Sequence, residues 1–447
     1  MKYAAPLVLL LALGACSSNR SSTSVQEDQE FHRISRAGYA SQLQGFWLGQ
    51  SIANWTGLIT EMDKLGGDGF EGKGAGFYTR EDWGGPDDPN IWGGAGPSPD
   101  GTIRFYVDPQ DGAWGADDDT DVEYMYMDLT SRSAHPRLTG DEIRDGWLRH
   151  IYSDENTPFT DGEGRPENYL WVSNQMALDL MHKGVRPPET SDPERNPFFE
   201  MIDAQLTTEI FGLFAPGMPN VALDLAHLPI RTTARRDAAW IAEFYVIMYS
   251  LAPVSDPLVP IGARLRDMAA EARNHLPDSS YAAAMYDFVH AIHASGAPWE
   301  VTRDSLYERY QVRMEDGYDV ASRDPVCGGC FAAGINFGAG VISLLYGDGD
   351  LKETIKIGAL AGWDSDNPTA TWGGLIGFML GREGVENAFG QTFPDGFNIH
   401  RTRGGFANGI DRFPNMAARG VSVVDRVIED MTDGRVEGDA WYVPTAR

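Results

Sequence analysis

Residues 361–377 read AGWDSDNPTATWGGLIG, an acidic pair followed by a run of small residues. Asp364, Asp366 and the amide of Asn367 offer three hard oxygen donors of the kind that Mg²⁺, Mn²⁺ or Ca²⁺ binds. Pro368 fits the first turn of a helix, so these side chains would lie near the positive helix N-terminus. The alternative is a capping cluster, in which Asp366 or Asn367 only caps that helix. The segment alone leaves both interpretations open.

A second acidic group lies far upstream, where residues 117–121 read DDDTD. Asp119 or Thr120 is a suitable cap for a helix that begins near Asp121. Adjacent carboxylates repel one another by roughly 1 to 4 kcal/mol per close pair, depending on the local dielectric. Because a cap needs only one of them, we favour a divalent cation that neutralises the others. The two acidic groups together therefore indicate a metal-dependent hydrolase.

The composition sets the class of protein. The chain has 447 residues, of which 42% are hydrophobic, and this is enough for a large packed core. Its formal net charge of −29 argues against a nucleic-acid-binding surface, which needs a basic stripe. We therefore expect no nucleic-acid partner.

The N-terminus has the pattern of a targeting segment and is kept apart from the fold. An apolar run ends in Leu13-Gly14-Ala15-Cys16, which resembles the lipobox of bacterial lipoproteins. We predict a signal peptide over residues 1–15, lipidation of Cys16 and a flexible tether over residues 16–34. In that class of lipoproteins, Ser17 after the cysteine favours the outer membrane, facing the periplasm of the cell envelope. The alternative is an ordinary secretory signal with an accidental cysteine.

Two further cysteines, Cys327 and Cys330, form the motif CGGC. In an exported protein this spacing favours a short structural disulfide. Free thiols, or redox or metal chemistry, are the alternatives. A zinc site would need two more ligands nearby, and none is evident in the sequence.

Helical periodicity dominates the chain from residue 121 onward, and the breaks fall at Pro, Gly and Asp. Upstream, residues 64–115 are rich in Gly, Pro, Asp and Trp and predict a long ordered loop or a short hairpin. One strand is conceivable at residues 102–107. We expect a single all-α domain over residues 35–447. The predicted helices span residues 39–61, 121–129, 141–152, 166–183, 197–213, 236–251, 260–274, 282–295, 332–346, 351–362, 368–380 and 416–433.

Three motifs stand in order along the chain: GFWLGQSIANWTG at residues 45–57 with Glu61 after it, DDDT at residues 117–120, and WDSDN at residues 363–367 before the glycine run. Together they resemble the ADP-ribosylglycohydrolases. The family patterns are G-x-L-L-G-x-A-x-G-D-A-x-G-x-x-x-E, T-D-D-T and G-D-T-D-T, and the first can be laid on this chain without a gap. Three motifs in the right order are far more specific than any one of them.

The resemblance implies an all-α, multi-helix domain with a metal cleft that holds two Mg²⁺ ions, Mn²⁺ being the alternative. It implies hydrolysis of the glycosidic bond between ADP-ribose, or a related nucleoside or sugar derivative, and an acceptor. Glu61 would be the mobile acid near the scissile bond, and an exposed side chain without a role is the alternative. The candidate metal ligands are Asp117, Asp118, Asp119, Asp364, Asp366 and Asn367, of which Asp118 and Asp119 are also candidate catalytic residues.

The sequence departs from the family pattern at several positions. Asp117 stands where the family has Thr or Ser, and Asn367 where it has Thr, but both still offer an oxygen. Ala53 and Asn54 replace a Gly-Asp pair. These departures leave two alternatives open: a hydrolase of the same scaffold with an unrelated extracytoplasmic substrate, and a binding lipoprotein that has lost catalysis.

Overall fold

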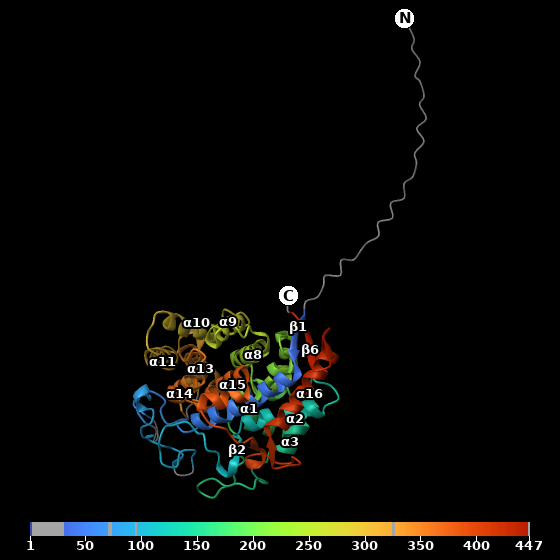
Figure 1. The fold of residues 1–447 in the computed structure, drawn as a ribbon. Coiled ribbons are helices and arrows are strands. Elements are labelled where there is room, and N and C mark those ends of the chain that lie inside the picture. Colours follow the sequence, from blue (N-terminus) through green and yellow to red (C-terminus); the bar gives the residue numbers. More distant parts are fainter. Residues whose placement is uncertain (2–30, 70–73, 94–95, 324–326, 446–447) are drawn as a thin grey trace.

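The computed structural model describes residue 1 and residues 31–69, 74–93, 96–323 and 327–445 (Figure 1). The predicted signal peptide, Cys16 and residues 16–30 of the predicted tether lie outside these residues. Within them, no helix is both long enough and apolar enough to cross a membrane.

The helices are α1 (Arg36–Gly57), α2 (Thr120–Arg132), α3 (Gly140–His150), α4 (Val172–His182), α5 (Ala204–Thr208), α6 (Ile210–Phe214), α7 (Pro219–Ile230), α8 (Arg236–Leu251), α9 (Ile261–Arg273), α10 (Tyr281–Ala294), α11 (Trp299–Tyr307), α12 (Val320–Arg323), α13 (Ala333–Gly347), α14 (Leu351–Ala361), α15 (Asp366–Phe389) and α16 (Phe413–Met431).

The centre of the fold is the crossing of α1 and α15, which pack along their length (Figure 1). Gly45 and Gly49 on α1 face Gly373 and Gly377 on α15, so closely that a Cβ on any of the four would lie within 2.5 Å of another atom. The glycines lower helix propensity by roughly 1 kcal/mol each relative to alanine, but they permit the two backbones to touch. From Gly45 to Gly57 every residue of α1 is buried, as expected for a central helix.

Two small sheets tie distant parts of the chain together. Strand β1 (Phe31–Ser35) pairs antiparallel with β6 (Ala440–Pro444), which also pairs with β5 (Arg435–Glu437). Strand β2 (Ala113–Gly115) pairs parallel with β3 (Gly396–Asn398), and β3 pairs antiparallel with β4 (Ile410–Arg412). The second sheet brings the segment after residue 396 beside the acidic group that starts at residue 117.

The all-α prediction is confirmed, with differences in detail. Residues 102–107 form no strand: only Thr102 pairs, as an isolated bridge with Pro86. The side chain of Phe105 instead packs edge-to-face on Trp83. Residues 31–34, expected in the tether, belong to β1, because the C-terminal strand β6 offers them backbone partners.

Helix boundaries differ from the prediction where tertiary contacts outweigh periodicity. The helix expected over residues 166–183 begins only at Val172, and the one expected over residues 197–213 divides into α5 and α6. Helices α7, α11 and α12 were not expected at all. The helix expected to start at Pro368 begins two residues earlier, at Asp366, so Pro368 still occupies its first turn.

Candidate metal centre

The loop after α1 carries Glu61 to the start of α15. The backbone N–H of Met62 donates to the carbonyl oxygen of Trp363 at 2.8 Å, one residue before Asp364. Trp363 adopts a φ of 59°, a left-handed conformation that costs on the order of 1 kcal/mol or more for a residue with a Cβ. Its indole N–H donates to Gln311 at 2.8 Å and holds it there. The strain is stored where two segments far apart in sequence meet at the site.

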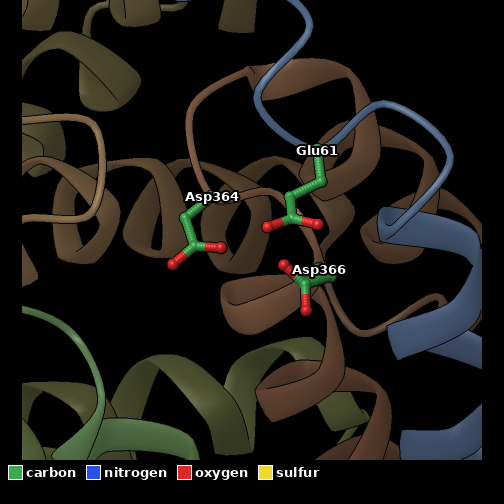
Figure 2. Close-up of side chains that lie close together, drawn as sticks. All are labelled: Glu61, Asp364 and Asp366. Carbon is green, nitrogen blue, oxygen red and sulfur yellow. The ribbon is translucent and has the colours of Figure 1, made fainter. Parts of the chain in front are cut away.

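Glu61, Asp364 and Asp366 converge from this junction (Figure 2). Each contributes a carboxylate oxygen, and these oxygens lie within 4.8 Å of one another. Asp364 and Asp366 are buried and Glu61 is half-buried. Burial raises the pKa of both aspartates well above the usual value. The charge of Glu61 adds to the shift of Asp364, and the charge of Asp364 adds to the shift of Asp366. A divalent cation would oppose this shift and favour the ionised carboxylates.

Asn54 joins the two acidic motifs from α1. Its amide nitrogen donates to Asp117 and, at 3.2 Å, to Asp366. The other oxygen of Asp117 accepts from the backbone N–H of Thr120 at 2.7 Å and from the Thr120 hydroxyl. These bonds tie Asp117 to the first residue of α2, whereas Asp119, expected as a possible cap, makes no capping bond with its side chain. Asp117, Asp118 and Asp119 all line the cleft, and all three lie outside the cluster of Glu61, Asp364 and Asp366.

Asp119 is held by two amides. One of its oxygens accepts from Asn174 at 3.1 Å, and the other accepts from Asn367 at 2.6 Å. Burial, reinforced by the charge of Asp118, raises the pKa of Asp119 well above its usual value. Burial and the charge of Asp117 raise the pKa of Asp118 to about 7. Asn367 thus links the downstream motif directly to the upstream one.

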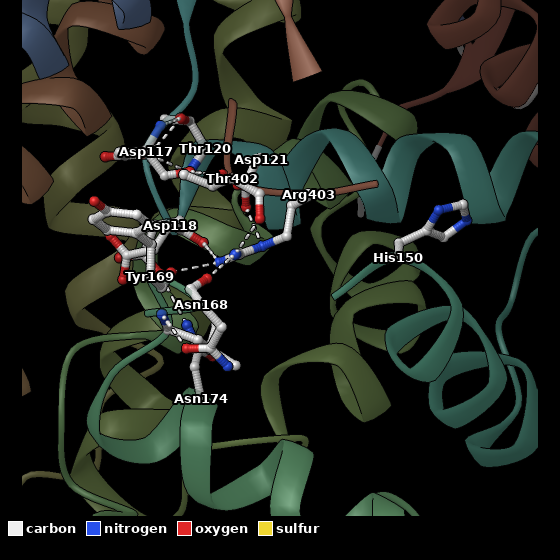
Figure 3. A network of polar contacts seen from close by, with 12 residues as sticks. Asp117, Asp118, Thr120, Asp121, His150, Asn168, Tyr169, Asn174, Thr402 and Arg403 are labelled. Atoms are coloured by element: carbon white, nitrogen blue, oxygen red, sulfur yellow. Dashed lines mark hydrogen bonds and ion pairs between the residues drawn. The ribbon is translucent and has the colours of Figure 1, made fainter. Parts of the chain in front are cut away.

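Arg403 fixes the backbone around the acidic group (Figure 3). Its Nε lies 2.9 Å from Asp121, and both side chains are fully buried. Its Nη1 donates to the carbonyl of Asn168 at 2.9 Å, and its Nη2 donates to those of Tyr169 at 2.9 Å and Asp118 at 3.3 Å. One guanidinium therefore sets the position of the Asp118 segment against the loop before α4.

The donors around the cleft fit a hard cation. In the described part of the chain, buried oxygens without a hydrogen-bond partner surround it, and a buried unpaired oxygen is costly unless something binds it. All are carboxylate or amide oxygens, which suits Mg²⁺ or Mn²⁺. Those on residues that line the cleft or bind its carboxylates are Asn54 Oδ1, Asn174 Oδ1, Asp203 Oδ2, Asp366 Oδ1 and Asn367 Oδ1.

The cleft is a cavity of about 290 Å³ with an acidic floor and aromatic walls. The tryptophan- and glycine-rich segment contributes Ile91 and Trp92, and Trp92 is 39% exposed. Tyr169 and Trp171, which precede α4, line another part of the wall. Such rings suit stacking against a planar group of a ligand.

Sequence reasoning missed several residues of this cavity. Asp203 lines the cavity, and its Oδ1 accepts from the backbone N–H of Asn174 at 2.9 Å. Burial raises the pKa of Asp203 to about 6. Nothing in the sequence around residue 203 marks it, because its acidic partners lie far away along the chain. Arg401, also on the wall, was missed for the same reason.

In the CGGC segment Cys327 and Cys330 form a disulfide, and Phe331, which follows it, lines the cleft. The carbonyl of Cys330 accepts from the amide of Asn336 at 2.8 Å, and Asn336 accepts in turn from the backbone N–H of Asp364 at 3.2 Å. The disulfide loop is thus one hydrogen-bonded residue away from the carboxylate cluster.

Comparison with known proteins decides the family. A family model for ADP-ribosylglycohydrolase matches residues 35–411, a range that contains both acidic motifs and Glu61. The chain belongs to this family. The resemblance seen in the three motifs is therefore confirmed, and the protein is a member of a glycohydrolase family.

Other comparisons are weaker. A solved structure described as an ADP-ribosylglycohydrolase-related protein complex is 15% identical, with a TM-score of 0.49 over 87% of this chain and 98% of that chain. Among curated proteins, none matches the sequence. The family assignment therefore rests on the family model, whose range covers most of the helical domain.

Proposed function

We propose that this protein is a metal-dependent hydrolase that cleaves the glycosidic bond of ADP-ribose conjugates. The observation that carries the proposal is the convergence of Glu61, Asp364 and Asp366 in one cleft, with oxygens within 4.8 Å of one another. Membership of a glycohydrolase family supports the reaction class. The aromatic walls of the cavity support a substrate with planar rings.

The chain offers enough oxygen ligands for two Mg²⁺ ions, with Mn²⁺ as the alternative. Bound there, the metal would orient the sugar hydroxyls and lower the pKa of an attacking water. The residues that would hold it line the cleft and are Asp118, Asp119, Asp364, Asp366 and Asn367, with Asp117 as a further candidate whose oxygens also bind Asn54 and Thr120.

The carboxylates have a role of their own in the reaction. Cleavage at an anomeric carbon develops positive charge on the sugar, and carboxylates nearby stabilise it. Glu61 is the member of the cluster that is only half-buried, so it is the one best placed to reach substrate and exchange a proton with it. Asp364 and Asp366 are held by the fold and position the charge.

The proposal extends to the location of the enzyme. The lipobox at residues 13–16 supports a lipid anchor at Cys16 and a place in the bacterial cell envelope. Labelling of cells with a radioactive fatty acid should mark the wild type and not Cys16→Ala. An unlabelled wild type would refute the anchor.

Release of ADP-ribose from a mixture of ADP-ribosylated proteins tests the activity. We expect release with Mg²⁺ and none with EDTA. Asp364→Asn and Asp366→Asn should abolish both metal binding, measured by titration calorimetry, and release. The matched control is Asp267→Asn, an exposed aspartate on α9, which should change neither. Metal binding without release from any conjugate would point instead to an unrelated extracytoplasmic substrate. Absence of metal binding would point to a protein that has lost catalysis.

A further inference from the structure

Two arginines in one loop, Arg401 and Arg403, differ in whether their guanidinium groups are paired with other residues. Arg403 is buried, and its guanidinium nitrogens contact one carboxylate and several backbone carbonyls. Arg401, at the end of the short helical turn Ile399–Arg401, makes no hydrogen bond or ion pair with the described residues, and its guanidinium lies 4.2 Å from the ring of Trp55. Stacking on an aromatic face leaves the N–H edge of a guanidinium available.

The position of Arg401 is built by its neighbours. Pairing of β2 with β3 sets Gly115 opposite Asn398, three residues before Arg401. The indole N–H of Trp55 donates to the carbonyl of Gly115 at 2.8 Å, and Tyr106 stacks on the same indole at 5.2 Å. A Cβ at Gly115 would lie 2.7 Å from Trp55 and 3.1 Å from Arg401, so glycine makes room for the stack.

No carboxylate of the described residues forms an ion pair with the guanidinium of Arg401. Burial lowers the pKa of Arg401, and the charge of Asp117, whose oxygens accept from Asn54 and Thr120, opposes this shift. Among the described residues that line the cavity, Arg401 is the only lysine or arginine, and the other charged residues of the lining are carboxylates. A cation with free donors, held at the wall of an acidic cleft, is complementary to an anionic group of a ligand.

We propose that Arg401, stacked on Trp55, is the subsite that binds a phosphoryl group of the substrate. This inference rests on the proposed function for the identity of the substrate, since ADP-ribose carries phosphoryl groups. The planar fork of a guanidinium binds two phosphoryl oxygens at once. Arg401 then fixes the substrate at one wall, while the carboxylate cluster faces the sugar.

Binding of paired probes tests the subsite on full-length, Mg²⁺-loaded protein. AMP and ADP-ribose are compared with adenosine by titration calorimetry. We expect the phosphorylated probes to bind more tightly, and Arg401→Gln to weaken them roughly 10- to 100-fold, the usual range for a lost charge-assisted hydrogen bond. Adenosine binding should not change, and Arg401→Lys should restore part of the loss. Arg104→Gln, at a half-exposed surface ion pair with Asp100, is the matched control and should bind all probes as wild type does.

The outcomes separate this inference from the proposed function. Equal binding of AMP and adenosine by the wild type would overturn the subsite. A phosphoryl preference that survives in Arg401→Gln would also overturn it, because the phosphoryl group would then lie on the metal. If no conjugate is cleaved but the preference depends on Arg401, the subsite stands and the proposed reaction fails. If conjugates are cleaved, Arg401→Gln should raise KM and leave kcat nearly unchanged.

Discussion

Replacing Gly49 with alanine would test how the helix crossing positions the site. A Cβ at Gly49 would lie 2.3 Å from the carbonyl oxygen of Gly373 and 3.0 Å from Gly377 Cα. Ordinary contact begins at 3.4 Å, so α1 and α15 must separate by about 1 Å, because close-packed backbone cannot turn aside as a side chain can. We expect the free energy of unfolding to fall by about 3 kcal/mol, the upper end of the usual overpacking cost.

The same separation should reach the cleft. Helix α15 begins at Asp366, and α1 leads directly into the loop that carries Glu61. A displacement of about 1 Å between groups that act together can cost on the order of 100-fold in rate, and we expect a loss of that size in ADP-ribose release. Urea denaturation measures the stability, and Mg²⁺ titration measures the site.

A control on the same helix makes the result specific. Gly38 is exposed in the first turn of α1, and a Cβ there would lie 3.5 Å from its nearest neighbour, in ordinary contact. Gly38→Ala should leave stability within about 0.5 kcal/mol of wild type and activity unchanged. If Gly49→Ala behaves like Gly38→Ala in both assays, the close helix contact does not determine the geometry of the site.

Two further predictions concern Glu209 and the disulfide. Burial raises the pKa of Glu209 to about 8, against about 4.3 in an unfolded chain, so the wild type loses stability as pH rises between these values. The stability that Glu209→Gln gains over wild type should therefore grow from pH 5 to pH 8 in urea denaturation, and a pH-independent difference would contradict this. Cys327→Ser combined with Cys330→Ser should lower the free energy of unfolding by about 2 kcal/mol, as loss of a short disulfide loop does, and leave hydrolysis intact. Loss of hydrolysis in the still-folded double variant would show that the disulfide does more than stabilise.

The sequence could predict those parts of the site that lie in compact motifs. Asp364, Asp366 and Asn367 stand within four residues of one another, and their side-chain chemistry alone indicates oxygen ligands. Asp203 and Arg401 could not be predicted this way. Each stands alone in its segment and becomes part of the cleft only because chain packing brings it there.

The role of Asp117 shows a different limit. In sequence it is one of three adjacent carboxylates, and all three are equivalent as candidate ligands. In the structure its oxygens accept from Asn54 on another helix and from Thr120 three residues later. All three line the cleft, but the donor that each one binds depends on tertiary contacts, as the bond from Asn54 to Asp117 shows.

The sequence by itself determined the helical class of the protein, its three family motifs and the oxygen chemistry of its acidic groups, because periodicity and residue type are local properties. Only the tertiary structure decided that Glu61 meets Asp364 and Asp366, through the bond from Met62 to Trp363 and the glycine contact of α1 with α15. It also left the side chain of Arg401 without an acceptor among the residues that the structure describes, while that of Arg403 is ion-paired with Asp121 and hydrogen-bonded to backbone carbonyls. Such pairings depend on which backbones can approach closely, and no local pattern records that.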